Sequence, residues 1–186
     1  MKFIDYICQD FKARDKDFSI IKTLWRVYRI PGYKLLLNYR IAQYYLKFTP
    51  PSSLCVIWLY ISRLRLERLS GKYCFSITEQ LQSKSGLSFP HNGPCVINSS
   101  AIIGHNCTIH PNVLIGGDRG KGAPVIGDNV FIGNGAKIIG NCNIGSWVFI
   151  SPGAVITKDV PDGSVVGFGL NKILNNDGRR HVTMYL

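Results

Sequence analysis

This chain of 186 residues lacks several patterns that indicate common classes of protein. Its six cysteines include no CxxC pair and its four histidines show no metal-ligand spacing, so we expect no zinc or other metal site. The longest uncharged apolar stretch, LCVIWLYI at 54–61, is too short to span a bilayer. Because the first residues also lack the pattern of a secretory signal, we expect a protein of the reducing cytoplasm.

Acidic residues are scarce. The chain has eleven Asp and Glu against 22 Lys and Arg, which gives a formal net charge of +11. The excess belongs to residues 1–75, with fourteen basic and five acidic residues, rather than to 76–186, with eight and six. Such a segment indicates an anionic partner, for example a membrane surface or a charged glycan, or else a solvated basic helix face. We expect no nucleic-acid partner and keep peripheral membrane contact as an alternative.

An internal repeat of six residues organises the second half of the chain. An aliphatic residue returns every six positions, and a small residue follows four positions after each one except Ile115. The isoleucines of the repeat are Ile97, Ile103, Ile109, Ile115, Ile126, Ile132, Ile138, Ile144, Ile150 and Ile156. The small residues are Ala101, Cys107, Val113, Val130, Ala136, Cys142, Val148, Ala154 and Val160.

A period of six fits neither an α-helix nor an ordinary amphipathic strand. It predicts a triangular coil in which each hexad forms one flat side and one corner, and three hexads close one turn. The isoleucines then stack in the interior, while Gly, Asn and Asp take the corner conformations. The predicted fold class is therefore mainly β, with a parallel β-helix over residues 76–166.

Two irregularities interrupt this repeat. Phe89 and Ile97 are eight residues apart, so one coil holds two extra residues, within the stretch PHNGP that contains His91. Ile115 and Ile126 are eleven apart, so a loop with about five extra residues protrudes at 117–124. Because insertions in a solenoid usually lie on its functional face, we look for chemistry at these two places.

Residues 1–75 show helical periodicity instead. Apolar stripes predict about four helices, and Pro31-Gly32 is expected to end the second of them. We expect an α-helical cap that makes core and subunit contacts, with a membrane role for its last two helices as the alternative. Residues 167–186 form a tail without the repeat. The four stripes cover residues 3–11, 20–28, 33–48 and about 53–70.

Three segments, together with the helical N-terminus, resemble the serine O-acetyltransferase branch of the hexapeptide-repeat acyltransferases. The likeness covers roughly residues 20–175 and is closest to the shorter members found in bacterial polysaccharide gene clusters. It implies a left-handed β-helix, acetyl-CoA as co-substrate, and a homotrimer with its active site between neighbouring β-helices; some members form hexamers through the helical cap. The segments are GLSFPHNGPCVINSSAIIGHNCTIHPNVLIGG, APVIGDNVFIGNGAKIIGNCNIG and ISPGAVITKDVPDGSVV.

The resemblance also implies roles for individual residues. His91 matches the catalytic general base of the family. Gly117, Asn134 and Pro152 match positions whose backbone lines the pantetheine arm of coenzyme A. The loop 118–124 matches the loop that folds over the acceptor.

Further candidates surround these positions. Lys158 is a candidate contact for a coenzyme phosphate. Asp118, Arg119 and Lys121 in the loop are candidate acceptor contacts, and His110 borders the expected acceptor cleft. A solvated loop and a structural corner histidine are the alternatives for these residues.

The chain departs from the family pattern at several positions. The aspartate that orients the catalytic histidine corresponds to Ser76, the acidic residue before that histidine is Pro90, and a second active-site histidine corresponds to Ala123. These losses favour a sugar hydroxyl of a surface-polysaccharide precursor as acceptor over free serine. Ser76 lies about one coil upstream of His91 and can accept a hydrogen bond, but it cannot stabilise an imidazolium as a carboxylate does.

Histidine suits acyl transfer because its pKa lies near neutrality, and His91 is the best candidate because its coil is irregular and contains glycine. A structural corner residue is the alternative. Three functions remain open: O-acetylation of a sugar, O-acetylation of serine for cysteine synthesis, and a non-catalytic scaffold. The zinc carbonic anhydrases of the same coil class need three histidines on adjacent coils, which this spacing does not give.

Overall fold

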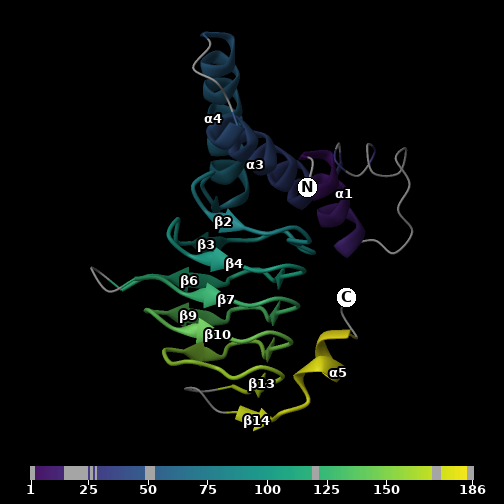
Figure 1. The fold of residues 1–186 in the computed structure, drawn as a ribbon, viewed down its shortest axis with the longest axis vertical. Coiled ribbons are helices and arrows are strands. Elements are labelled where there is room, and N and C mark those ends of the chain that lie inside the picture. The colour runs from purple at the N-terminus through teal and green to yellow at the C-terminus, as the bar shows by residue number, and fades with distance from the viewer. Residues whose placement is uncertain are drawn as a thin grey trace.

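The computed structural model describes residues 3–14, 25, 27, 29–48, 53–118, 122–168 and 173–183. Short strands stack in successive coils along one axis, and helices cover the N-terminal end of the stack (Figure 1). The last helix of this cap ends at Tyr73 and the first strand begins at Phe75.

Three sheets form the three sides of the coil, and every pairing is parallel except that of the last strand. The first sheet contains β1 (Phe75–Ser76), β3 (Cys95–Ile97), β6 (Leu114–Gly116), β9 (Lys137–Ile139) and β12 (Val155–Ile156). The second contains β2 (Gln82–Ser83), β4 (Ile102–Ile103), β7 (Val125–Ile126) and β10 (Asn143–Ile144). The third contains β5 (Thr108–Ile109), β8 (Phe131–Ile132), β11 (Phe149–Ile150), β13 (Val165–Val166) and the antiparallel β14 (Ile173–Asn175).

The register of neighbouring strands confirms both irregular coils. A regular coil has eighteen residues, as between Val96 and its partner Leu114. Phe75 pairs with Cys95, which is two residues more. Leu114 pairs with Lys137, which is five more. The extra residues therefore leave the coil at its corners, and the strands on either side keep their register.

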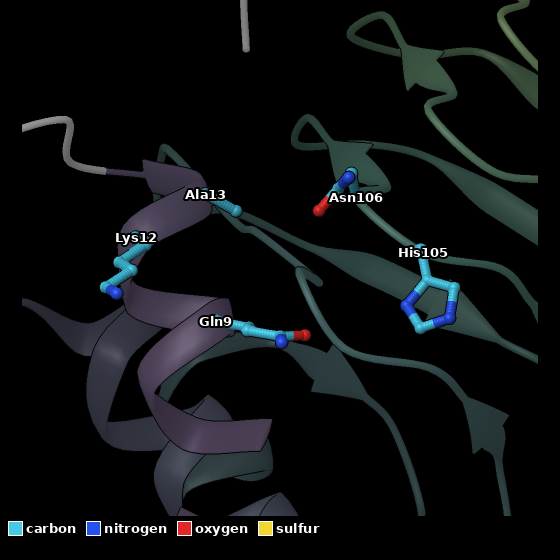
Figure 2. Close-up of a pocket in the computed structure, with 5 residues that line it drawn as sticks. All are labelled: Gln9, Lys12, Ala13, His105 and Asn106. Atoms are coloured by element: carbon cyan, nitrogen blue, oxygen red, sulfur yellow. The ribbon is translucent and has the colours of Figure 1, made fainter. Parts of the chain in front are cut away.

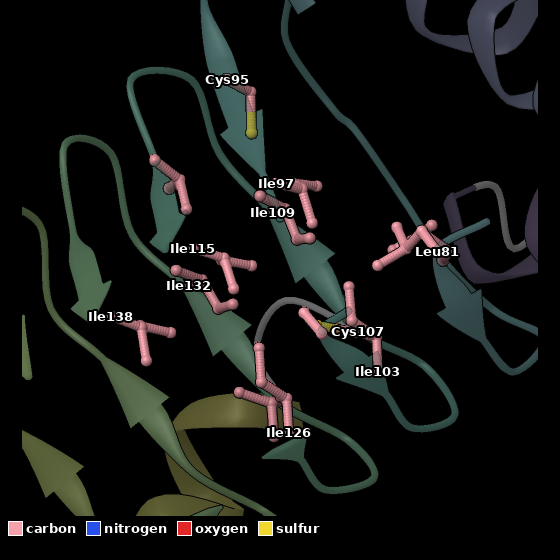
Figure 3. Close-up of a cluster of buried hydrophobic side chains, with 14 of the residues drawn as sticks. Leu81, Cys95, Ile97, Ile103, Cys107, Ile109, Ile115, Ile126, Ile132 and Ile138 are labelled. Carbon is pink, nitrogen blue, oxygen red and sulfur yellow. The ribbon is translucent and has the colours of Figure 1, made fainter. Parts of the chain in front are cut away.

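The interior of the coil is a column of aliphatic side chains, as the six-residue repeat predicts (Figure 3). Every isoleucine of the repeat is at most 3% exposed, and each small-residue position is at most 4% exposed. Two of those positions are Cys107 and Cys142, where the thiol acts as a small apolar group. Burial raises the pKa of the neighbouring Cys95 thiol to about 12, so this cysteine stays protonated at neutral pH.

Corner residues take left-handed backbone conformations. Asn106, Asn112 and Asn129 have φ values of 53°, 61° and 58°, which asparagine tolerates better than most residues. Trp147 and Cys74 are the exceptions, with φ values of 59° and 55° at equivalent corners. Arg179 belongs to the short helix α5 (Gly178–Thr183) of the C-terminal tail. Its guanidinium lies 4.9 Å from the centre of the Trp147 ring.

The cap is built from α1 (Phe3–Arg14), α3 (Pro31–Phe48) and α4 (Ser53–Tyr73). The prediction that the second helical segment ends at Pro31-Gly32 fits the described residues, because Arg29 is helical, Ile30 is not, and Pro31 begins the separate helix α3. Proline suits that position, since its missing N–H would have no partner in a first helical turn. The other helix expected there, over 20–28, falls largely outside the described residues.

A buried ion pair attaches the cap to the first coil. Arg40 on α3 donates to both carboxylate oxygens of Asp10 on α1, at 2.7 and 3.2 Å, and to the backbone carbonyl of Lys84 at 2.5 Å. Asp10 in turn accepts from the backbone N–H groups of Gly86 and Leu87 at 2.6 and 3.0 Å. Both side chains are at most 2% exposed. The pair thus links two helices to the backbone of the β-helix.

We predict that Asp10→Ala destabilises the protein by about 3–5 kcal/mol, because it leaves the Arg40 guanidinium buried without its counter-charge. Denaturant unfolding followed by circular dichroism measures the loss. Lys84→Ala is the control, since it removes an exposed ion pair whose atoms are 3.6 Å apart and should cost less than about 1 kcal/mol. Equal losses in the two variants would contradict this account of the cap.

Candidate functional site

His91 lies at the corner between the third and first sheets, in the coil with two extra residues. Its side chain is exposed to solvent. Gly93 passes so close to the next coil that a Cβ there would lie 2.7 Å from Cβ of Pro111. Only glycine allows this approach, so the bulge that carries His91 is held against the coil that follows it.

Four aromatic rings follow one another along this corner and the adjoining third sheet. The ring centres of His91 and His110 are 5.4 Å apart, with the planes at 60°. Phe131 lies 4.8 Å beyond His110, and Phe149 stacks on Phe131 at 4.7 Å with parallel planes. We call His91, His110, Phe131 and Phe149 the ring column. The exposed imidazole at its end therefore rests edge-to-face on a second imidazole.

His110 is half-buried within the ring column. Burial, and to a smaller extent the neighbouring His91, lower the pKa of its imidazole below the usual value of 6.5. At neutral pH this ring is therefore uncharged, so it contacts His91 without adding a positive charge beside it.

Asn134 and Pro152 occupy the same corner as His91, two and three coils further along, beyond Pro111. The backbone N–H of Gly135 donates to the carbonyl of Pro111 at 3.0 Å, and that of Gly153 donates to the carbonyl of Asn134 at 2.8 Å. A Cβ on Gly135 would meet no atom closer than 4.0 Å, so the backbone here is open to a ligand. We call His91, Pro111, Asn134 and Pro152 the His91 corner.

The remaining predicted residues lie at the next corner, beyond the first sheet. Gly117 packs against Asn98, and the N–H of Asp118 donates to the carbonyl of Gly122 at 2.9 Å, which closes the base of the protruding loop. Lys158 is exposed, two residues after β12. The face between the corners is about six residues wide, or roughly 15–20 Å. Arg119 and Lys121 lie outside the described residues.

Ser76 lies on β1, in register with Val96 on the outer face of the first sheet. It is exposed and lines a groove of about 410 Å³ between α4 and the first coil. Within the described part of the chain, no hydrogen bond joins Ser76 to His91, so its orienting role stays a prediction.

His105 lies at a different corner, between the second and third sheets. Its Nδ1 is 2.9 Å from Oγ of Ser85, and its backbone N–H donates to the carboxylate of Asp128 at 2.7 Å. With Lys12 and Asn106 it borders a hollow of about 440 Å³ between α1 and the coil (Figure 2). These bonds fit a structural role for this histidine.

Two kinds of site are missing from the described ranges. No group of three or more His, Cys, Asp or Glu side chains there is arranged to hold a metal ion. No helix in the same ranges has the length and apolar character needed to cross a membrane.

Sequence reasoning did not identify Phe131, Phe149 and Phe168 as part of this region. Phe131 and Phe149 occupy the same position in coils eighteen residues apart, and this recurrence was the available signal. Phe168 is 80% exposed, and its ring lies about 3.0 Å from where a Cβ of Gly153 would be. It marks the far end of the His91 corner.

Comparison with known proteins places the coil in a family of repeats. The model of bacterial transferase hexapeptide repeats, six in number, matches residues 123–158. A serine acetyltransferase of Synechococcus elongatus is 34% identical over 147 residues, which cover 74% of this chain and 54% of that protein. The chain thus spans about half the length of the curated relatives it matches.

Solved structures share the whole architecture. A serine acetyltransferase of Neisseria gonorrhoeae in complex with serine superposes with a TM-score of 0.71 at 27% identity, covering 90% of this chain and 67% of that one. A serine acetyltransferase in complex with CoA has a TM-score of 0.72, covering 92% and 69%. At 23% identity the latter supports the fold alone. The predicted fold, a left-handed parallel β-helix after an α-helical region, is confirmed.

We predict that His110 makes the folded chain sensitive to mild acid. Its lowered pKa means that the unfolded chain binds more protons than the folded chain below about pH 6.5, so the free energy of unfolding falls as the pH drops through that range. His110→Phe, which keeps a ring between His91 and Phe131, should lose less stability than the parent chain between about pH 7.5 and pH 5.5. Urea unfolding at both pH values measures this. An identical loss in both proteins would exclude His110 as the source.

Proposed function

Because the chain belongs to the hexapeptide-repeat acyltransferase superfamily, in its serine acetyltransferase-like branch, we propose that it transfers an acetyl group from acetyl-CoA to a hydroxyl acceptor. The observation that carries this proposal is the His91 corner. It combines one exposed imidazole, supported by a neutral ring, with backbone that is open at Gly135, two coils further along.

The open edge fits the extended pantetheine arm of acetyl-CoA. Asn134 and Pro152 lie at successive levels beyond His91, and the space outside Gly135 leaves room for a chain that follows the backbone. A ligand lying along this edge has its thioester end near His91. Lys158 is the proposed contact for a coenzyme phosphate, since its charge is exposed at the neighbouring corner.

His91 acts as general base in the proposed reaction. Its imidazole accepts the proton of the acceptor hydroxyl while that oxygen attacks the thioester carbon, and the proton then passes to the departing sulfur. The products are an acetyl ester and free coenzyme A thiol, with no acyl-enzyme required. His110 orients the His91 ring by its edge contact. Because His110 is uncharged at neutral pH, it does not oppose protonation of His91 during the reaction.

A second copy of the chain completes the proposed site. The base His91 lies at the corner before the strands of the first sheet begin, and the acceptor loop at Asp118 lies at the corner after they end. The two are too far apart for one acceptor to touch both. In a homotrimer, the loop of one protomer meets the His91 corner of its neighbour. The exposed Val96, between these corners, is an apolar side chain that such an interface would cover.

The comparisons favour L-serine as the acceptor over the sugar hydroxyl that the sequence favours. The relatives of this chain are serine acetyltransferases, and one of the solved structures contains serine. A sugar of a surface-polysaccharide precursor is the second candidate. Its support is local. The resemblance matches Ser76 to the aspartate that orients the catalytic histidine and Ala123 to a second active-site histidine, and neither Ser76 nor Ala123 can carry a charge.

We predict that His91→Ala lowers the rate of coenzyme A release by about 10²–10⁴-fold, because the hydroxyl loses its base. The rate is measured with acetyl-CoA, acceptor and a thiol-detecting reagent. His105→Gln is the matched control, since this histidine lies at another corner, and it should retain the parental rate. Undiminished turnover by His91→Ala would instead support the non-catalytic scaffold.

We predict saturable turnover with L-serine. A rate that rises with serine concentration to a plateau would support this acceptor, and the acetyl ester would be identified by mass spectrometry. Turnover with nucleotide-linked sugars but not with serine would assign the second candidate.

A further inference from the structure

The α3–α4 hairpin exposes large apolar side chains at the end that lies far from the β-helix. In Figure 1, α4 rises from the first coil, and its first residues are the most distant from the strands. Among the described side chains of these two helices, Leu35, Leu36, Tyr39 and Leu66 belong instead to the buried core. We call the exposed group the hairpin tip; it comprises Tyr44 (37% exposed), Leu46 (43%), Val56 (59%), Ile57 (53%), Trp58 (51%), Tyr60 (63%) and Leu64 (41%).

Basic side chains follow the hairpin tip on the same helix. Arg65 and Lys72 lie seven and fourteen residues after Trp58, hence on the same helical face, and Arg68 lies between them. All three are exposed, and Glu67 is the acidic residue among them. At a rise of 1.5 Å per residue, Arg65 is about 10 Å along the axis from Trp58. The exposed surface of α4 is therefore apolar at its outer end and basic nearer the coil.

We propose that the hairpin tip inserts into the interfacial layer of an anionic lipid surface. An interfacial helix buries its apolar groups about 5–10 Å deep, which matches the distance from Trp58 to Arg65; Arg63, which comes before it, is paired with Glu79. Tryptophan and tyrosine favour the boundary between acyl chains and headgroups, and the tip contains three such residues. Arg65 then lies at the level of the lipid phosphates, and Arg68 and Lys72 lie about 5 and 10 Å further out, still close enough to be attracted by the anionic surface.

The charge pattern favours lipid over a second copy of the chain as the occupant of this face. A symmetric pairing of two tips would bring two basic stripes together, with one Glu67 each to offset them. An anionic surface is attractive to the same stripe, by about 1 kcal/mol for each Lys or Arg near it. Residues 1–75 as a whole carry fourteen basic and five acidic residues, so their net positive charge also favours an anionic surface.

Vesicle flotation with the full chain tests the proposal without reference to catalysis. The probes are vesicles of phosphatidylcholine alone and vesicles that also contain phosphatidylglycerol. We expect the chain to float with the anionic vesicles, to float weakly with the neutral ones, and to be released by high salt. Failure to float with anionic vesicles at low salt would overturn the proposal.

Two variants, each with a matched control, separate the apolar and basic contributions. Ile57→Ser/Trp58→Ser should bind anionic vesicles at least about tenfold more weakly, whereas Ile4→Ser/Ile173→Ser, which removes exposed side chains elsewhere, should bind as the parent does. Arg65→Glu/Arg68→Glu should also lose about tenfold or more, whereas Arg179→Glu/Arg180→Glu on α5 changes the charge equally and should not.

Two outcomes would reject the lipid assignment. One is that Ile57→Ser/Trp58→Ser and Arg65→Glu/Arg68→Glu both bind anionic vesicles as strongly as the parent chain. The other is an oligomer in sedimentation analysis that Ile57→Ser/Trp58→Ser dissociates, with no vesicle binding by the parent; this would assign the face to a second copy.

Discussion

The stacking of one inward aliphatic side chain on each side of each coil is the interaction on which the structure depends. The strands are only two or three residues long, so none of them is stable alone. Each buried isoleucine contributes about 1.5–3 kcal/mol, but only when the coils above and below cover it. Stability is therefore a property of the stack, and the corners are free to carry other residues.

A stack has ends, and the N-terminal end is where the cap contributes most. An uncovered first coil would expose strand edges and the end of the aliphatic column. Tyr39, fully buried on α3, donates to the carbonyl of Leu81, and the Arg40–Asp10 pair satisfies further backbone groups of the same coil. The cap thus protects the coil that contains His91, and it also holds the hairpin tip away from the strands.

The repeat made the β-helix predictable down to individual buried positions, because each hexad forms one side of the coil and its isoleucine points into the interior. The bulge at His91 and the loop after β6 were also predictable, since the spacing between repeat positions there is eight and eleven residues instead of six. The Arg40–Asp10 pair was not, because it joins residues thirty positions apart on helices whose packing the repeat does not describe. The contact of His91 with His110 could not be predicted from the repeat, because it depends on the path that the two extra residues take at the corner. The distance between the loop and His91 could not be predicted until each strand was assigned to one of the three sheets.

The five extra residues after β6 leave the register of the first sheet intact, because each coil contacts only the coils beside it. Natural selection can therefore lengthen, shorten or replace that loop without disturbing the core or the His91 corner. Substrate range in such a scaffold can diverge rapidly while the coils stay nearly constant. Two chains with very similar repeats can thus differ in the loop that covers the acceptor while the coils beside it keep the same register.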